Sequence, residues 1–566
     1  MRSLCKKKHD AFKCGNKEQY KQLKYEFQRA VFKAKSSYKV KLENKLQAND
    51  IKGVWQGLQN ITNYKSKNQV LDSDPSLPGR LNDFYCRFDS GDHQSPSFSR
   101  EQGDTPPTIY EHDVRMLLLK QNPRKAAGPD GVSSATLKHC ANELAPVLTS
   151  IFNQSLQLCT VPACFKSAVI IPVPKKNNIT SLNDYRPVAL TSVIMKIFER
   201  LVCKHLSSVA LDPYQFAYRA NRSVDDAVSL CLHSILQHLE SRDTYARVLF
   251  VDFSSAFNTM VPGKLVSTLQ VLGVSTHLCR WIYNFLCNRT QVVKVADLVS
   301  LPRLLNTGAP QGCVLSPLLY SLYTHFCQSY SESVMLYKFA DDTSVVGLIT
   351  NGDESEYRRV VEERVRWCAE YNLLLNISKT KELIFDFRKK NRDDPSPLYI
   401  NGEVVERVTS FRFLGTTIHD SLSWDLNTSL IISKAHQRLY FLRQLKKFRV
   451  SQAAMTHFYR ATIESVLTFS MPVWFGHTTS QDKTRLERVV RRASRIIGCS
   501  LPTLESLHSI RIIRKAKKII ADNSHPAHHL FRLLPSGRRY GSIKCRTSRF
   551  RDSTYLVAIR HLNLTR

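Results

Sequence analysis

The middle of the chain contains short apolar runs that border acidic residues. The stretch from Leu336 to Leu348 places two β-favouring runs on either side of a tip that holds Asp341 and Asp342. This pattern predicts a strand, a tight turn and a second strand. Upstream, the apolar run that begins at Arg247 ends at Asp252, just before two serines. We interpret it as a central strand that presents a carboxylate at its C-terminal end, with a helix or turn cap at Asp252 as the alternative.

The two ends of the chain have a different pattern, in which apolar residues at helical spacing are surrounded by basic ones. Residues 1–88 are expected to form a basic helical extension with a narrow apolar stripe. Residues 89–108 contain Ser, Pro and Asp without periodicity, which predicts a linker loop. From residue 427 the chain becomes helical and basic again, and residues 535–551 are basic without clear periodicity. A solvated surface is the ordinary explanation of such charge, and contact with nucleic acid is the alternative.

The overall charge favours the second explanation. Among 566 residues, 81 Lys and Arg stand against 48 Asp and Glu, a net charge of +33. Such an excess favours a polyanionic partner, for which nucleic acid is the first candidate. No run reaches the roughly 18 apolar residues of a membrane-spanning helix, and the first residues lack the apolar core of a signal peptide. We therefore expect no membrane attachment.

The cysteine pattern bears on location and on metal binding. The 15 Cys are scattered without a Cys-x-x-Cys pair, which favours reduced thiols and hence an intracellular protein, nuclear and cytoplasmic. His525, His528 and His529 cluster near Cys545. A zinc knuckle would require closely paired cysteines, so metal binding is not expected there, and the pattern assigns this cluster no other role.

The two acidic segments together offer three carboxylates from two predicted strands. Carboxylates beside buried strands are costly unless a cation pairs with them, and hard cations such as Mg²⁺ take oxygen ligands. Two-metal phosphoryl transfer uses such a set, because one ion activates the attacking oxygen while the other stabilises the leaving phosphate. We predict Asp252 and Asp341 as the main ligands of two Mg²⁺ ions, with Mn²⁺ as an alternative ion. Asp342 is predicted to have an electrostatic or secondary ligand role, and a solvated Asp-Asp tip remains the alternative.

Three motifs lie in an order that carries a family resemblance. They are Asp252 with Ala256-Phe257, then the loop from Gly308 to Pro317 (Gly-Ala-Pro-Gln-Gly-Cys-Val-Leu-Ser-Pro), then Phe339 to Asp342 (Phe-Ala-Asp-Asp). This set resembles reverse transcriptases, most of all those of LINE-type (non-long-terminal-repeat) retrotransposons. The resemblance implies an α+β fold, the right-hand polymerase with fingers, a palm with an antiparallel sheet, and a helical thumb.

The resemblance also implies a domain order and a function. Fingers and palm are expected at residues 109–425, the thumb at 426–500, and a basic C-terminal extension at 501–566. In LINE-type proteins an endonuclease domain commonly comes first; the residues before the linker are too few to hold one, so we expect it to be absent here, unless a longer product carries it. The implied function is RNA-directed DNA polymerase, a nucleotidyltransferase that joins a dNTP to a DNA primer on an RNA template. The alternatives are a catalytically inactive nucleic-acid-binding remnant or co-opted protein, and an RNA-dependent RNA polymerase.

Family motifs next to the acids imply the nucleotide site. In the resembled family a lysine and an arginine of the fingers hold the incoming triphosphate; by position these are Lys175, with Lys176 as the other candidate, and Arg186. Lys acts on phosphate as a point charge and Arg as a bidentate fork. The fifth residue after Asp252, Phe257, corresponds to the aromatic side chain that excludes a 2′-hydroxyl, with ordinary core packing as its alternative.

The remaining motifs concern the template, the primer and the leaving group. Gln311 and Gly312, in the glycine-rich loop, are expected to contact the nucleotide or template, since glycine lets the backbone approach a ligand closely. Lys379, with Lys381 as a rival, matches the lysine that neutralises or protonates the leaving pyrophosphate. The turn of a predicted hairpin resembles the primer grip. Its residues are Phe413, Leu414 and Gly415.

One further segment suggests contact with the template strand. Residues 212–226 combine aromatic residues with Arg219 and Arg222. Aromatic stacking and phosphate contact are the means by which proteins hold single strands. Within the same segment, Ser223 is also predicted to be a helix N-cap with Asp226 in the first turn.

Overall fold

The computed structural model describes residues 2–62, 74–89, 96–98, 105–176, 178–389 and 395–564. Within these ranges the chain has a mixed fold of helices and sheets, as expected. Most of the predicted linker, residues 90–95 and 99–104, lies outside the described residues. No helix in the described ranges is long and apolar enough to cross a membrane.

A five-stranded sheet, which we call the central sheet, carries the acidic segments. In spatial order its strands are β12 (Glu406–Arg407), β9 (Lys381–Asp386), β3 (Thr244–Val251), β8 (Asp342–Thr350) and β7 (Val334–Phe339). β3 lies in the middle, antiparallel to both neighbours, and β7 and β8 form a hairpin. The predicted strand before Asp252 and the predicted strand, turn and strand around Asp341 are therefore confirmed.

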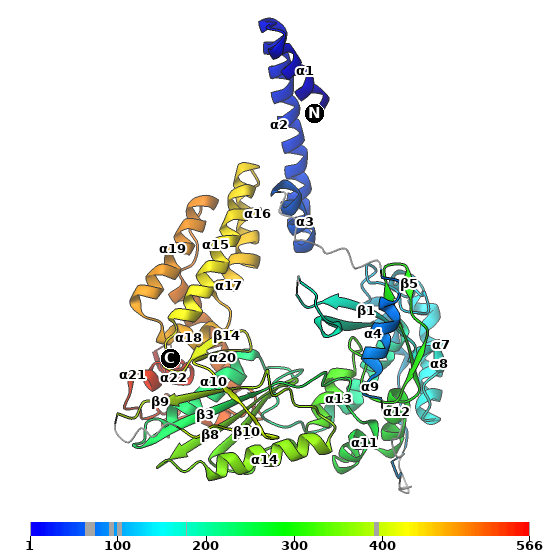
Figure 1. The fold of residues 1–566 in the computed structure, drawn as a ribbon, viewed down its shortest axis with the longest axis vertical. Helices are drawn as coiled ribbons and strands as arrows, with labels where there is room; N and C mark the ends of the chain where they lie inside the picture. The colour runs from blue at the N-terminus through cyan, green and yellow to red at the C-terminus, as the bar shows by residue number, and fades with distance from the viewer. Residues whose placement is uncertain are drawn as a thin grey trace.

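Helices cover both faces of the central sheet (Figure 1). Successive side chains of a strand point to opposite faces, so the apolar run of β3 can fill two cores. Val248 and Phe250 belong to the same apolar cluster as α10 (Val224–His238). Leu249 belongs to the cluster formed with α14 (Ser355–Glu370). This burial on both sides explains why the run is uniformly apolar rather than alternating.

A second sheet, the side sheet, lies beside the central one (Figure 1). Its strands are β2 (Tyr185–Thr191), β1 (Ala168–Pro174), β4 (Arg289–Val295) and β5 (Leu298–Val299), with β6 (Arg303–Leu305) paired to β4. α4 (Leu77–Cys86) packs against it. A separate apolar core joins the surrounding helices. They include α5 (Glu111–Leu119), α7 (Ala141–Gln157), α9 (Val193–His205), α11 (Pro262–Val271), α12 (Thr276–Leu286) and α13 (Ser316–Tyr323).

The chain after the central sheet forms a helical arm. Its main helices are α15 (Asp425–Lys447), α16 (Gln452–Phe458) and α19 (Ser480–Ile497). α15 and α19 pack side by side through buried apolar residues such as Leu442 and Val489. Their basic residues lie on the other faces, as the sequence pattern predicted.

The N-terminal helices dock on the tip of this arm. They are α1 (Arg2–Lys13), α2 (Lys17–Gln47) and α3 (Ile51–Thr62). The ring of Trp55 lies 4.8 Å from that of Phe441 and 5.8 Å from that of Phe458, centre to centre. Beyond this contact α2 extends away from the rest of the molecule (Figure 1).

The C-terminal region packs behind α10. Its helices include α20 (Leu504–Ile520) and α22 (Thr554–Leu564), and the hydroxyl oxygens of Thr554 and Ser229 lie 3.1 Å apart. Residues 535–551, which have no clear periodicity in the sequence, make contacts with the rest of the protein. The Thr547 backbone amide, for example, donates to the Glu240 carboxylate at 3.2 Å.

Candidate active site

The three predicted acids lie at one end of neighbouring strands. In the pairing of β3 with β8, Val251 stands opposite Thr343, and in the β7–β8 hairpin Phe339 stands opposite Asp342. Asp252 directly follows β3, and Asp341 lies in the turn between β7 and β8. All three acids therefore lie at the same end of these neighbouring strands. Ala340 turns the chain there with a φ of 59°. The structure thus brings together residues that are far apart in the sequence.

The acids perturb one another, which shows that they form one electrostatic cluster. Burial raises the pKa of Asp342 to about 6, with further contributions from the negative charges of Asp341 and Asp252. Burial also raises the pKa of Asp252, where Lys379 acts in the opposite direction and Asp341 raises it again. The pKa of Asp341 is likewise raised by burial. Bringing carboxylates together in this way costs free energy that a bound cation would recover.

A buried ion pair next to the acidic turn holds the end of β7 in place. The Lys338 ammonium lies 2.6 Å from the Asp212 carboxylate, and each side chain is only 2% exposed. Gln215 extends this anchor, because its side chain accepts from the Ala340 backbone amide at 3.0 Å and donates to the Ala340 carbonyl at 3.3 Å. Sequence reasoning missed these residues, although Lys338 stands in a strand that is otherwise apolar, and an unexpected charge there was the available signal.

A basic cluster lies close to the acids. Pairing of β1 with β2 sets Val173 opposite Arg186, so Lys175 and Arg186 lie at the same end of that hairpin. Burial lowers the pKa of Lys175, and the positive charges of Lys379 and Arg186 lower it further, while Asp252 is near enough to raise it. The predicted triphosphate-binding residues and the predicted general-acid lysine are therefore brought to one place.

The structure separates the two pairs of rival lysines. Lys176 lies 2.9 Å from the Asp184 carboxylate, and Lys381 lies 2.7 Å from Glu406, so each is paired with an acid outside the site. Lys379 is 59% exposed, with its ammonium 3.9 Å from Asp252. The geometry favours Lys175 and Lys379, the residues preferred from the sequence.

The glycine-rich loop is held against the segment that follows Asp252. The Ala309 amide donates to the Phe257 carbonyl at 2.7 Å, and Gly308 has a φ of 76° with backbone atoms of residues 257 and 258 only 2.8 Å from where a Cβ would stand. Buried Arg289 donates to the carbonyls of Thr307 and Gly308. Only glycine fits at residue 308 without displacing the backbone.

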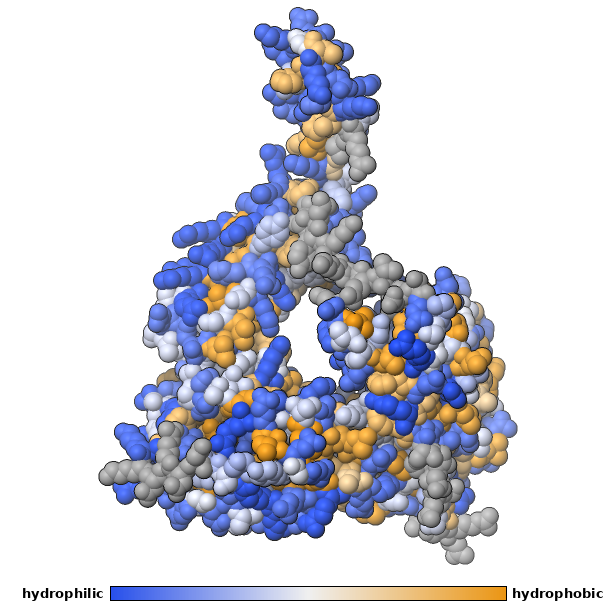
Figure 2. All heavy atoms as spheres, viewed as in Figure 1, coloured by the Kyte–Doolittle hydropathy of each residue, from blue (hydrophilic) through white to orange (hydrophobic). Residues whose placement is uncertain are grey.

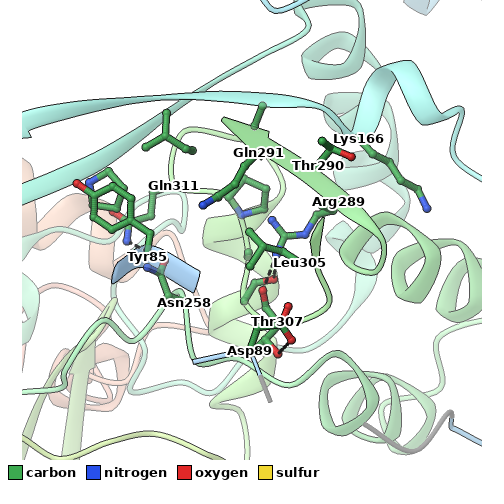
Figure 3. A pocket seen from close by; sticks show the side chains of 16 residues that line it. Tyr85, Asp89, Lys166, Asn258, Arg289, Thr290, Gln291, Leu305, Thr307 and Gln311 are labelled. Atoms are coloured by element: carbon green, nitrogen blue, oxygen red, sulfur yellow. Dashed lines mark hydrogen bonds between the residues drawn. The ribbon is translucent and has the colours of Figure 1, made fainter. Parts of the chain in front are cut away.

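Gln311 lies at the mouth of a small pocket behind this loop. Figure 3 shows its side chain directed toward Asn258, with Arg289 and Thr307 on the other side of the pocket. The Gln311 side chain donates to the Asn258 carboxamide oxygen at 3.3 Å, and the Gln311 carbonyl accepts from the Ala189 amide at 2.7 Å. The loop therefore connects the segment after Asp252 to the side sheet. Asn258 was not predicted.

A buried acid holds the start of α13. Glu199, on α9, accepts from the backbone amides of Val314 and Leu315 at 2.6 and 2.8 Å. Burial raises the pKa of Glu199 to about 7, although these hydrogen bonds act against that rise. Sequence analysis assigned Glu199 no role. Its position explains how the loop after Gly312 is fixed.

Aromatic contacts position Phe257 and the predicted primer-grip hairpin. The ring of Phe257 is half-buried and lies 4.8 Å from that of Tyr320 on α13. The predicted primer-grip hairpin exists as β13 (Ser410–Phe413) and β14 (Thr416–His419), with Leu414 and Gly415 in left-handed conformations at the turn. Phe250 of β3, two residues before Asp252, packs on this hairpin, 5.1 Å from the Phe413 ring.

The site provides donors for a hard cation. Carboxylate oxygens are the ligands that Mg²⁺ prefers, and the mutual repulsion of the three acids fits a site that holds positive charge. Within the described ranges no three His, Cys, Asp or Glu side chains already converge as a ready metal site. The C-terminal histidine cluster is also accounted for by protein contacts, since buried His525 lies 3.3 Å from Asp226.

Comparisons with known proteins agree with this geometry. Residues 173–418 match the family model described as reverse transcriptase (RNA-dependent DNA polymerase). This part of the chain is therefore similar to reverse transcriptase domains. The matched segment includes the acid cluster, the basic cluster, the glycine-rich loop and all of the hairpin except His419. A second model, described as the N-terminal part of alkylated DNA repair protein alkB homolog 8, matches residues 424–465.

The particular relatives are polymerases of mobile elements. The chain is 26% identical over 463 residues to the probable RNA-directed DNA polymerase from transposon BS of Drosophila melanogaster, covering 75% of this chain and 50% of that protein. It is 25% identical to the RNA-directed DNA polymerase from mobile element jockey of the same fly, covering 64% and 41%. The resemblance to polymerases of LINE-type retrotransposons is thus confirmed. The chain spans about half the length of these relatives.

A solved telomerase of Candida tropicalis, in complex with a fragment of telomeric RNA, is 13% identical. It covers 68% of this chain and 66% of its own, with a TM-score of 0.35 that is too low to define a shared fold.

Proposed function

We propose that this chain is an RNA-directed DNA polymerase that adds deoxynucleotides to a primer 3′-hydroxyl on an RNA template. The observation that carries the proposal is that three acids lie together at one end of the central strands, with a basic cluster beside them. Phosphoryl transfer of this kind depends on positioning and on stabilisation of charge rather than on covalent chemistry. The acids and the basic cluster at this end of the strands provide groups for both positioning and charge stabilisation.

The overall arrangement supports a right-hand polymerase. In this proposal the central sheet is the palm, the side sheet with its helices is the fingers, and the helical arm is the thumb. Residues 109–425 then form fingers and palm, and residues 426–500 the thumb. Figure 2 shows an opening between the helical arm and the side-sheet region, above the central sheet. Basic residues of α15, such as Lys434 and Arg438, would contact the backbone of the primer–template duplex bound there.

Asp252, Asp341 and Asp342 would hold two Mg²⁺ ions, or Mn²⁺. Bound there, the ions would lower the pKa of the attacking hydroxyl and neutralise the developing charge on the phosphate. The chain's own residues supply the remaining functions. The charges of Lys175 and Arg186 would orient the triphosphate, and the exposed ammonium of Lys379 would neutralise the departing pyrophosphate.

The loop and hairpin would select and position the substrates. Gln311, fixed through Asn258, would contact the nucleotide or the template base. Phe257, supported by Tyr320, would exclude a 2′-hydroxyl and so favour deoxynucleotides. The turn at Leu414 and Gly415 would hold the primer end near Asp252, since the hairpin packs on the strand that carries this acid.

Extension of a DNA primer on an RNA template tests the proposal. Wild-type protein should extend the primer with dNTPs and Mg²⁺, and Asp341→Asn should abolish extension while leaving template binding intact. Asp297→Asn, which removes one negative charge from an exposed turn between β4 and β5, is the matched control and should extend normally. No extension by the wild type, together with RNA binding that is unchanged by Asp341→Asn, would identify a nucleic-acid-binding remnant instead.

A further inference from the structure

Two adjoining hollows lie between α10, α13 and the C-terminal region. The smaller, of about 260 Å³, is lined by α20 and by the start of α10. The larger, of about 1240 Å³, extends from residues 521–524 past residues 206–211 to the start of α13. Asn221 and Arg222 line both hollows. The three acids, the basic cluster, Phe257 and Gln311 line neither hollow, whereas Val314 and Pro317, at the end of the glycine-rich loop, line the larger one.

The smaller hollow has a positively charged wall. Arg514 and Lys518 are one helical turn apart on α20 and both line it. Within the described part of the chain neither makes an ion pair, and Arg514 and Lys518 are both exposed. Lys515, which lies between them, is already neutralised by Asp226 at 2.9 Å. Arg514 and Lys518 are therefore available to an external anion.

A buried ion pair fixes the wall that the C-terminal region contributes. Arg222, 1% exposed, lies 2.6 Å from the Asp522 carboxylate and donates to the Ser524 hydroxyl at 3.1 Å. These contacts hold residues 521–524 against the segment predicted from the sequence to meet the template. The C-terminal region therefore forms part of the walls of both hollows and is held there by specific contacts.

The larger hollow ends beside the catalytic acids. Tyr218 lines it, is 53% exposed, and has a left-handed backbone with a φ of 59°. Tyr218 follows Gln215 by three residues, and the Gln215 side chain bonds to the Ala340 backbone directly before Asp341. Burial raises the pKa of the Tyr218 hydroxyl, and the charges of Asp341 and Asp342 raise it further. An exposed aromatic ring next to a cationic wall is the combination that holds single strands, through stacking and phosphate contact.

We infer that the two hollows form a track for the unpaired template RNA ahead of the primer terminus, with α20 and residues 521–524 as one wall. This inference rests on the proposed function, because it assigns a substrate strand to the same site. A single strand is favoured over a duplex because only unpaired bases present their faces to a ring such as Tyr218. Arg514 and Lys518 would contact the phosphates further along the strand.

Binding measurements with two kinds of primer–template test the track without requiring catalysis. One substrate ends flush with the primer, and the other carries an unpaired RNA extension of about 10 nucleotides. The extension should strengthen binding by the wild type. Lys518→Glu should remove most of this gain, on the order of tenfold, and lower the salt dependence by about 0.7 per lost phosphate contact. Binding of the flush substrate should not change.

The neighbouring residue provides the matched control. Lys517 is exposed on the same helix but lines neither hollow. Lys517→Glu makes the same change of charge and should keep the gain. Equal losses in the two variants, or no gain from the extension in the wild type, would overturn the track. A photoreactive nucleotide in the extension should crosslink to residues 518–524, and crosslinks confined to α15 and α19 would also overturn it.

The result of the binding test can be distinguished from the result of the primer-extension test of the proposed function. If the wild type never extends a primer but shows the Lys518-dependent gain, the polymerase activity fails and the track stands. If it extends primers normally and the gain is insensitive to Lys518→Glu, the track fails and the activity stands.

Discussion

Removal of the Lys338 ammonium should destabilise the region that carries the acids. Lys338→Met keeps most of the side-chain volume and removes the charge that faces Asp212 at 2.6 Å. The ammonium also donates to the carbonyls of Thr324 and Cys327 at 2.6 and 2.9 Å, and these lose a donor. Breaking one side of a buried ion pair costs about 3–5 kcal/mol, because the remaining charge stays buried without compensation.

A second ion pair of similar length provides the control. Lys176 lies 2.9 Å from Asp184, but its side chain is 51% exposed. Exposed pairs contribute about 0–1 kcal/mol, so Lys176→Met should have little effect. The double variant Lys338→Met with Asp212→Asn should recover part of the loss, since it also removes the stranded carboxylate.

Hydrogen exchange measured by mass spectrometry is the suitable assay, because a chain of this size need not unfold in one step. Peptides from β7 and β8 should exchange faster in Lys338→Met, by an amount equivalent to the expected loss of stability, and peptides from the side sheet should not change. A loss below about 1 kcal/mol, equal to that in Lys176→Met, would refute the reasoning that burial makes this pair essential.

Three other outcomes are expected. Because the pKa of Asp342 is about 6 and the site needs its charged form, primer extension should rise with pH through about 6 and level off above it, and Asp342→Asn should lose this rise in a pH–rate profile. The folded-state pKa of Glu199, about 7, lies above the ordinary value of 4.5, so stability should fall by about 3 kcal/mol as pH rises from 4.5 to above 7. Glu199→Gln should flatten that dependence in thermal unfolding. Phe257→Val should raise the use of ribonucleotides relative to deoxynucleotides by about tenfold or more in competition assays.

The sequence was sufficient to predict the features that depend on residues close together in the chain. Apolar runs identified β3, β7 and β8, and the acids at their ends followed from strand direction alone. The helix N-cap predicted at Ser223 is present, and it forms a capping box with Asp226, only three residues away. The order of motifs then indicated the family, which the comparisons confirmed.

Residues that act over long separations escaped prediction. Gln215 supports Ala340 across 125 positions, and Arg222 holds Asp522 across 300. Neither pairing leaves a local pattern, since the two partners of each pair lie in segments far apart in the sequence. The docking of Trp55 on the helical arm was missed for the same reason. Residues 535–551 lacked clear periodicity in the sequence, and the structure holds part of this segment through long-range contacts such as that of Thr547 with Glu240.

The packing of α22 on α10 bears on how the chain could be shortened. The match to the reverse transcriptase family ends at residue 418, yet α10 depends on residues well beyond it for the cover of its outer side. A protein trimmed to the matched segment would expose a broad apolar strip and would be prone to aggregate. The apolar core that contains α10 therefore extends beyond the segment that matches the family.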